Sequence, residues 1–278
     1  GNATVWATWR EGDALLQGKR DYSSCALTGS ATACGGSGNA IIPNFYITPE
    51  IINDEGEAVL DYANGFLYKT LDSNSALIDS VGNRYNYNPV NHYMRPDERW
   101  SIGAIADYQL SDTTTVYGEF MFNSDATRGQ IAESGTFFAE EYLLPVDNSL
   151  FPQAFQDSLA ELFPDSENVG MYIGKRNVEG GQRVSVINHD ALRAVIGLEG
   201  EINDSWTYNV SYQYSQTTGS NTYLNDFFAP KIATAVNGAA CAADSDCIPY
   251  EVFTYQGVTP EMAANLTGVA SMVGTVSQ

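Results

Sequence analysis

Two long segments in which apolar and polar residues alternate strictly constrain the fold of this chain more than any other feature. The first runs from Arg99 to Leu110, and its apolar row is Trp100, Ile102, Ala104, Ala106, Tyr108 and Leu110. After the turn at Ser111–Thr113, the alternation resumes with Val116, Gly118, Phe120 and Phe122 in one row. Because successive side chains of a β-strand point to opposite faces, this pattern predicts a hairpin with one apolar and one largely polar face.

The same design returns 92 residues further along, counted from Trp100 to Leu192. A second turn at Asn203–Ser205 separates two apolar rows, which are Leu192, Ala194, Ile196, Leu198, Gly200 and Ile202, and then Trp206, Tyr208, Val210, Tyr212 and Tyr214. Soluble strands usually run ~5–6 residues, whereas a tilted strand that crosses a bilayer needs ~9–11, with its apolar residues outward. The rows carry aromatic residues near their ends, as the aromatic belts of membrane proteins do. Both hairpins therefore predict strands that cross a membrane.

The connections between these hairpins are very long (11–98, 124–190 and 217–265), whereas the turns within them are short. Outer-membrane barrels show this asymmetry, with long loops on the extracellular side. We therefore predict an all-β fold, an antiparallel transmembrane β-barrel segment with long extracellular loops. Its six strands are expected at Asn2–Arg10, Arg99–Leu110, Thr114–Ser124, Ala191–Ile202, Trp206–Gln216 and Leu266–Val276. Six strands leave two unpaired edges, which lipid does not tolerate, so we expect an incomplete barrel that further strands of the same polypeptide complete.

Charge and motifs exclude several classes of function. Lys and Arg number 13 against 34 Asp and Glu, and this net charge of −21 argues against nucleic-acid binding. The two histidines, His92 and His189, lie far apart, and the sequence has no nucleophile elbow, zinc-protease motif or phosphate-binding glycine loop. The acidic runs at 53–56 and 244–246 are interpreted as solvated turns. We expect no enzymatic activity, no cofactor and no metal site.

Four cysteines form two close pairs, Cys25 with Cys34 and Cys241 with Cys247, each among residues typical of loops. A four-thiolate metal site is the alternative, but neither spacing is Cys-x2-Cys and no histidine is close. We predict two local disulfide bonds and an oxidising compartment.

Several segments together resemble the TonB-dependent outer-membrane receptors, and most closely a proteobacterial branch with very long loops. These segments are GNATVWATWR (1–10), LLQGKRDYSSCA (15–26), YNYNPVNHYMRPDERW (85–100), YGEFMF (117–122), GQIAESGTFF (129–138), GLEGEINDSWTY (197–208) and FTYQGVTP (253–260). The resemblance spans nearly the whole chain and keeps its order. The combination of these segments is specific, whereas each segment alone matches the family only loosely.

The resemblance implies a 22-stranded barrel closed by an N-terminal plug domain and energised by the TonB–ExbB–ExbD complex. This sequence departs from the family pattern because it contains neither a plug nor a TonB box. Residues 1–278 are therefore expected to be a middle portion of the barrel, set in outer-membrane lipid, with the plug and the remaining strands as partners. The implied activity is energised uptake of a large nutrient such as an iron chelate, oligosaccharide or peptide. A passive porin-type channel and a secreted all-β binding module remain as alternatives.

Two groups of residues are candidates for ligand contact. The polar rows would point five charged side chains into the lumen, namely Asp107, Glu119, Arg193, Glu199 and Glu201; the alternative is that they are merely solvated wall residues. The densest aromatic and polar cluster in a loop is Tyr85, Tyr87, His92, Tyr93 and Arg95, whose rings and donors suit sugars, peptides or chelates. This stretch also leads into a strand, and its aromatic residues could equally pack the base of the loop.

Overall fold

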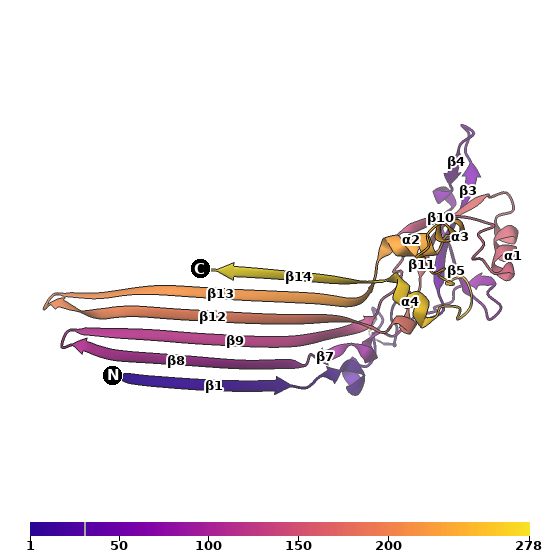
Figure 1. The fold of residues 1–278 in the computed structure, drawn as a ribbon. Helices are drawn as coiled ribbons and strands as arrows, with labels where there is room; N and C mark the ends of the chain where they lie inside the picture. The colour runs from indigo at the N-terminus through magenta and orange to yellow at the C-terminus, as the bar shows by residue number, and fades with distance from the viewer. Residues whose placement is uncertain (31) are drawn as a thin grey trace.

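The computed structural model describes residues 1–30 and 32–278, and it is built from one long antiparallel sheet with a compact head at one end (Figure 1). The long sheet has the strand order β1-β8-β9-β12-β13-β14. Its strands are β1 (Asn2–Gly12), β8 (Asp97–Ser111), β9 (Thr114–Glu133), β12 (Gln182–Asn203), β13 (Trp206–Phe227) and β14 (Thr267–Ser277). All six predicted strands are confirmed, including the less regular first and last ones. Within the described residues the sheet does not close, because β1 and β14 each have a single neighbour.

Three of these strands are about twice as long as the alternation indicated. Strand β9 has 20 residues, and β12 and β13 have 22 each, so segments expected to be loops continue the ladder. The sequence pattern ends early because β13 is polar on both faces from Thr217 to Thr222, and because the apolar residues of β12 nearest the head, Val184, Val186 and Ile187, do not keep to one face. The backbones of β12 and β13 nevertheless stay paired up to the end nearest the head, where Val184 lies opposite Leu224. At ~3.3 Å per residue, a 22-residue strand is roughly 70 Å long.

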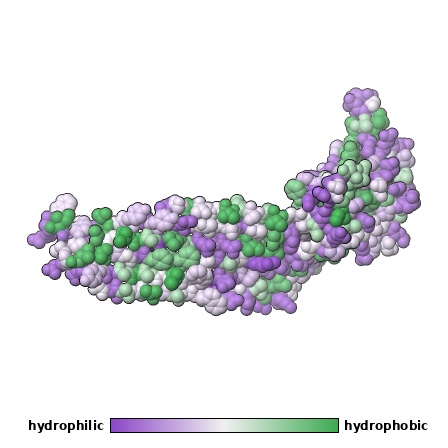
Figure 2. All heavy atoms as spheres, viewed as in Figure 1, coloured by the Kyte–Doolittle hydropathy of each residue, from purple (hydrophilic) through white to green (hydrophobic). Residues whose placement is uncertain are grey.

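The register confirms that the alternating rows share faces. Tyr108 pairs with Val116, Val116 with Leu198, and Leu198 with Val210, so the apolar rows of four strands form one continuous face. This apolar face is open, and its side chains on β12 and β13 are 60–70 % exposed at Ile196, Val210 and Tyr212. Hydrophobic residues are spread over the long sheet and are densest away from the head (Figure 2). The two hairpin turns, Asp112–Thr113 and Asp204–Ser205, lie together at the end away from the head.

The head contains a second sheet with the order β10-β11-β3-β5-β6, and β4 pairs with β3. Its strands are β3 (Asn44–Ile52), β4 (Ala58–Leu60), β5 (Leu67–Leu71), β6 (Leu77–Asp79), β10 (Glu141–Pro145) and β11 (Asn168–Gly174), and a small ladder joins β2 (Leu15–Leu16) to β7 (His92–Met94). The helices are α1 (Gln153–Leu162), α2 (Ala229–Ala235), α3 (Gly238–Ala242) and α4 (Pro260–Leu266). Short 3-10 helices are η1 (Gln17–Lys19), η2 (Asp21–Ser23), η3 (Tyr62–Asn64), η4 (Asn88–Val90) and η5 (Val178–Gly180).

The three long connections meet in one hydrophobic core inside the head. Each contributes one fully buried phenylalanine, Phe45, Phe155 and Phe253, whose ring centroids lie 5.4–6.0 Å apart. Burying a large side chain of this kind stabilises a fold by about 1.5–3 kcal/mol. The interpretation of these connections as loops is therefore wrong for much of their length. Their strands are short and their apolar residues are scattered over three distant segments, so no single stretch shows a regular period.

Candidate functional site

The register places all five charged candidates on the polar face of the long sheet. Glu119 lies opposite Val195 on β12, two residues from Arg193, while Asp107 lies opposite Tyr117 on the same face. Glu199 and Glu201 follow at two-residue steps along β12. The period of two therefore predicted correctly that these side chains share a face.

A hydrogen-bonded network covers the middle of this face. The Arg193 guanidinium donates to Glu119 Oε2 at 2.5 Å and to Gln213 Oε1 at 3.1 Å. A second chain runs from the Tyr117 hydroxyl to Asn209 Oδ1 at 2.8 Å, and from Asn209 Nδ2 to Glu199 Oε2 at 3.2 Å. These side chains are exposed, and exposed ion pairs contribute only ~0–1 kcal/mol to stability. The network is an ordered polar wall rather than an enclosed site.

Two glycines allow aromatic rings to lie flat against this wall. A Cβ added to Gly103 would overlap the Trp6 ring, and a Cβ added to Gly197 would overlap the Tyr117 ring. Glycine in a strand interior often marks such a close approach. The glycines that interrupt the polar rows are therefore packing positions beneath the rings.

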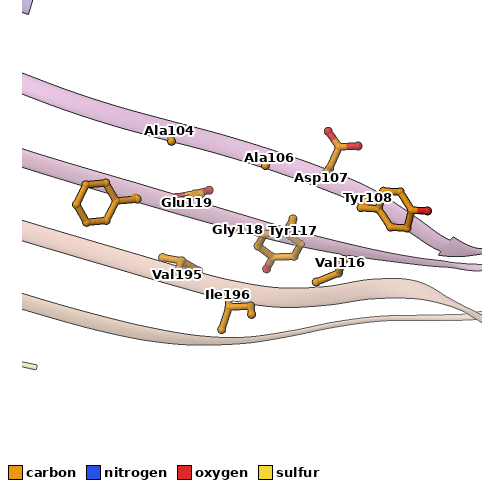
Figure 3. A pocket seen from close by; sticks show the side chains of 11 residues that line it. Ala104, Ala106, Asp107, Tyr108, Val116, Tyr117, Gly118, Glu119, Val195 and Ile196 are labelled. Atoms are coloured by element: carbon orange, nitrogen blue, oxygen red, sulfur yellow. The ribbon is translucent and has the colours of Figure 1, made fainter. Parts of the chain in front are cut away.

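A hollow of about 450 Å³ lies on the long sheet over β8, β9 and β12 (Figure 3). Three small residues, Ala104, Ala106 and Gly118, lie between larger side chains of the apolar face, including Tyr108 and Ile196. Most of its lining is apolar, but Asp107, Tyr117 and Glu119 of the polar rows line it as well. It is a hollow over β8, β9 and β12 rather than an enclosed site.

The structure does not bring the predicted loop cluster together in one site. Tyr93 packs edge-on against Tyr22 at 5.8 Å, and His92 Nδ1 lies 3.1 Å from the Arg128 carbonyl oxygen of β9. Tyr85 is half-buried and donates its hydroxyl hydrogen bond to Glu133 Oε2 at 2.7 Å.

The remaining two residues of this cluster, Tyr87 and Arg95, are exposed. The alternative interpretation, that these aromatic residues pack the base of a connection, describes Tyr85 and Tyr93 well.

Tyr85 belongs instead to a buried polar junction between the long sheet and the head. Glu133 and Arg176 are each only 4 % exposed, and the Arg176 guanidinium donates to the Glu133 carbonyl oxygen at 2.6 Å. Gln182 donates to Glu133 Oε1 at 2.9 Å. Burial raises the pKa of Tyr85, as does its hydrogen bond to Glu133, and burial lowers the pKa of Arg176. The sequence analysis missed this junction because its residues come from three distant segments, around Tyr85, around Glu133 and from Arg176 to Gln182.

A strained corner of the chain completes this junction. Phe137 and Phe138 both have positive φ, 55° and 51°, a region that costs an L-residue roughly 1–2 kcal/mol. Phe137 lies within 5.0 Å of the Arg176 guanidinium and 5.2 Å of that of Arg183. Cation–π contacts and the surrounding hydrogen bonds offset the strain. Because of this backbone conformation, the side chains of Phe137 and Phe138 pack in two different parts of the head.

Both predicted disulfide bonds are confirmed, Cys25–Cys34 and Cys241–Cys247. Both lie in the head. Among the residues that the structure describes, no three or more potential metal-ligating side chains cluster together.

Comparison of this chain with protein-family models, with curated proteins and with solved structures returns no match in any of the three. In the described part of the chain, no helix has the length and hydrophobicity needed to cross a membrane.

Proposed function

We propose that this chain forms part of the barrel of an outer-membrane receptor that takes up a large nutrient by TonB-coupled transport. One observation carries the proposal: a sheet of long antiparallel strands exposes one apolar face and one polar face, with tight turns at one end and a folded head at the other. The TonB-coupled mechanism is proposed from the sequence resemblance alone. The membrane-spanning role of the sheet is proposed from the geometry of its strands.

The open apolar face supports a lipid environment. In water, soluble proteins rarely leave contiguous apolar patches larger than a few hundred Å². Here the exposed apolar rows continue across β1, β8, β9, β12 and β13, from Val5 to Val210. The hydrocarbon chains of a bilayer would cover that apolar face. Hydrogen bonds between neighbouring strands satisfy the backbone N–H and C=O groups between them.

The arrangement of the ends supports an orientation. Barrels of this class have short periplasmic turns and long extracellular loops, so the head would lie outside the cell. Both disulfide bonds are in the head, where an oxidising environment keeps them formed. Captured nutrient would then pass along the wall that carries Glu119 and Arg193, past the plug domain that the resemblance implies.

Two adjacent residues of β13 allow a direct test of the lipid contact. Val210 lies on the apolar face and Ser211 on the polar face, opposite Gly197. In the full-length protein, a fluorophore on Val210→Cys should be quenched by brominated lipid and one on Ser211→Cys by aqueous iodide. Equal quenching of both by iodide would refute membrane insertion and favour the secreted module.

The receptor and the passive channel differ in their energy source. A plug and a TonB box encoded upstream of Gly1, together with uptake that stops when the inner-membrane proton gradient is dissipated, are expected for the receptor. A channel with an open lumen would lack both properties, and uptake that survives loss of the gradient would refute the energised mechanism.

A further inference from the structure

The head sheet buries only one of its two faces. On the other face, Tyr172 of β11 lies directly opposite Tyr46 of β3, and Tyr46 lies opposite Tyr68 of β5. Directly paired residues of neighbouring strands point to the same side. Three tyrosines therefore form a row across three strands, and Glu141 of β10, opposite Tyr172, ends the row.

Further rings surround this row. The Tyr46 and Tyr68 rings are stacked with centroids 4.6 Å apart, and Phe138 lies 5.1 Å from Tyr46. Phe66 lies 6.1 Å from Tyr46 and 5.8 Å from Tyr172. We call Tyr46, Phe66, Tyr68, Phe138 and Tyr172 the aromatic platform. Phe66 is 44 % exposed and Tyr46 is 37 % exposed, so the platform is open to a ligand.

Local geometry holds the platform in place. A Cβ added to Gly174 would overlap the Phe138 ring, so the glycine lets this ring lie against the sheet. The positive φ of Phe138 turns its side chain toward Tyr46 rather than toward the buried junction that holds Phe137. A strained backbone that positions a half-buried ring beside an open aromatic row points to a role beyond packing.

Hydrogen-bonding groups border the rings. Tyr62, whose ring lies 6.0 Å from Phe66, donates to Glu141 Oε2 at 2.5 Å. The other carboxylate oxygen of Glu141 is buried, and it has no hydrogen-bond partner among the described residues. The hydroxyls of Tyr46, Tyr68 and Tyr172 likewise make no hydrogen bond within the described part of the chain. The platform thus combines flat apolar faces with a carboxylate and hydroxyls at their edges.

The charges around the aromatic platform indicate which class of ligand it can bind. Glu141 ends the tyrosine row, Glu140 precedes it in the chain and Asp61 caps the 3-10 helix that contains Tyr62, whereas Lys69 of β5 is already paired with Asp79 at 2.7 Å. The chain as a whole carries a net charge of −21. Phosphorylated or uronic-acid ligands would meet uncompensated negative charge, so an uncharged ligand fits this border better.

We propose that the aromatic platform binds a neutral oligosaccharide. The C–H face of a sugar ring is flat and apolar, and its rim is polar, so it matches aromatic faces bordered by hydroxyls and a carboxylate. Strands lie ~4.8 Å apart, so the tyrosine row is roughly 10 Å long and accommodates two consecutive sugar rings. The inference rests on the proposed function only where it identifies this oligosaccharide as the imported nutrient.

The test uses the intact full-length protein in detergent and isothermal titration with maltohexaose, cellohexaose and xylohexaose, with hexagalacturonate as the anionic control. At least one neutral chain should bind and the anionic chain should not. Phe66→Ala should weaken that binding at least tenfold, while Tyr22→Ala, which changes an exposed tyrosine elsewhere in the head, should leave it unchanged. Absence of binding by all three neutral chains, or an equal effect of both substitutions, would overturn the proposal.

Two further measurements separate the possible failures. Phe66→Cys in the purified full-length protein in detergent should react with a maleimide; protection would show that another segment covers the platform and would also overturn the proposal. The quenching pair at Val210 and Ser211 reports membrane insertion independently. Correct quenching without sugar binding refutes the oligosaccharide site alone, and sugar binding without lipid quenching refutes the receptor alone.

Discussion

A single arginine placed on either side of the same strand tests the membrane assignment by its energetic cost. Ile196 lies near the middle of the apolar row of β12 and is 60 % exposed, and its neighbour Val195 points to the polar face opposite Glu119. We compare Ile196→Arg with Val195→Arg in the full-length protein. Both substitutions replace a β-branched residue in one strand, so their effects on strand propensity are matched.

The expected difference follows from the surroundings of each position. An arginine on the lipid face near the bilayer midplane costs about 2–4 kcal/mol. At position 195 the guanidinium would remain in water beside the Glu119 carboxylate, so a change of ~0–1 kcal/mol is expected. In a soluble sheet, both exposed substitutions would stay within about 0.5 kcal/mol of the parent.

Guanidinium titration of the protein folded in phospholipid vesicles, followed by tryptophan fluorescence, measures the free energy of unfolding of each variant. Ile196→Arg should be less stable than Val195→Arg by at least about 1 kcal/mol, the gap left between the two ranges. Equal stabilities, or a greater loss for Val195→Arg, would show that the face with Ile196 does not contact lipid.

Two other predictions concern local packing and ionisation. Gly197→Ala should destabilise the long sheet by about 1–3 kcal/mol, because the new methyl group would displace the Tyr117 ring; Gly274→Ala in β14, where a Cβ meets no atom within 4 Å, is the matched control in the same unfolding assay and should not share the loss. Hydrogen bonding to Glu141 raises the pKa of Tyr62 to about 12, so Glu141→Gln should make one tyrosine ionise at lower pH in a near-ultraviolet absorbance titration, and an unchanged titration curve would contradict the contact.

The sequence predicted the long sheet well where side-chain chemistry alternates. From Trp100 to Leu110 one face carries apolar side chains and the other largely polar ones, so the period of two identifies both the strand and its faces. From Thr217 to Thr222 both faces are polar, and backbone pairing continues without a signal in the side chains. The ends of β9, β12 and β13 were therefore missed.

The head was missed for a different reason. Tyr46, Tyr68 and Tyr172 become neighbours only when strands from two connections pair, and no local spacing records that contact. The cluster from Tyr85 to Arg95 has a high local density of aromatic residues, yet the fold sends its members to different partners. The two disulfide bonds were predictable because each joins cysteines that are close in sequence.

The shared core of the head makes the three long connections depend on one another. Phe45, Phe155 and Phe253 come from three different connections, so assembly of the head depends on contacts between residues distant in sequence. No one of the three connections can be deleted or exchanged without exposing the core residues of the other two. The head therefore ties the ends of the two hairpins together through a core that all three connections share.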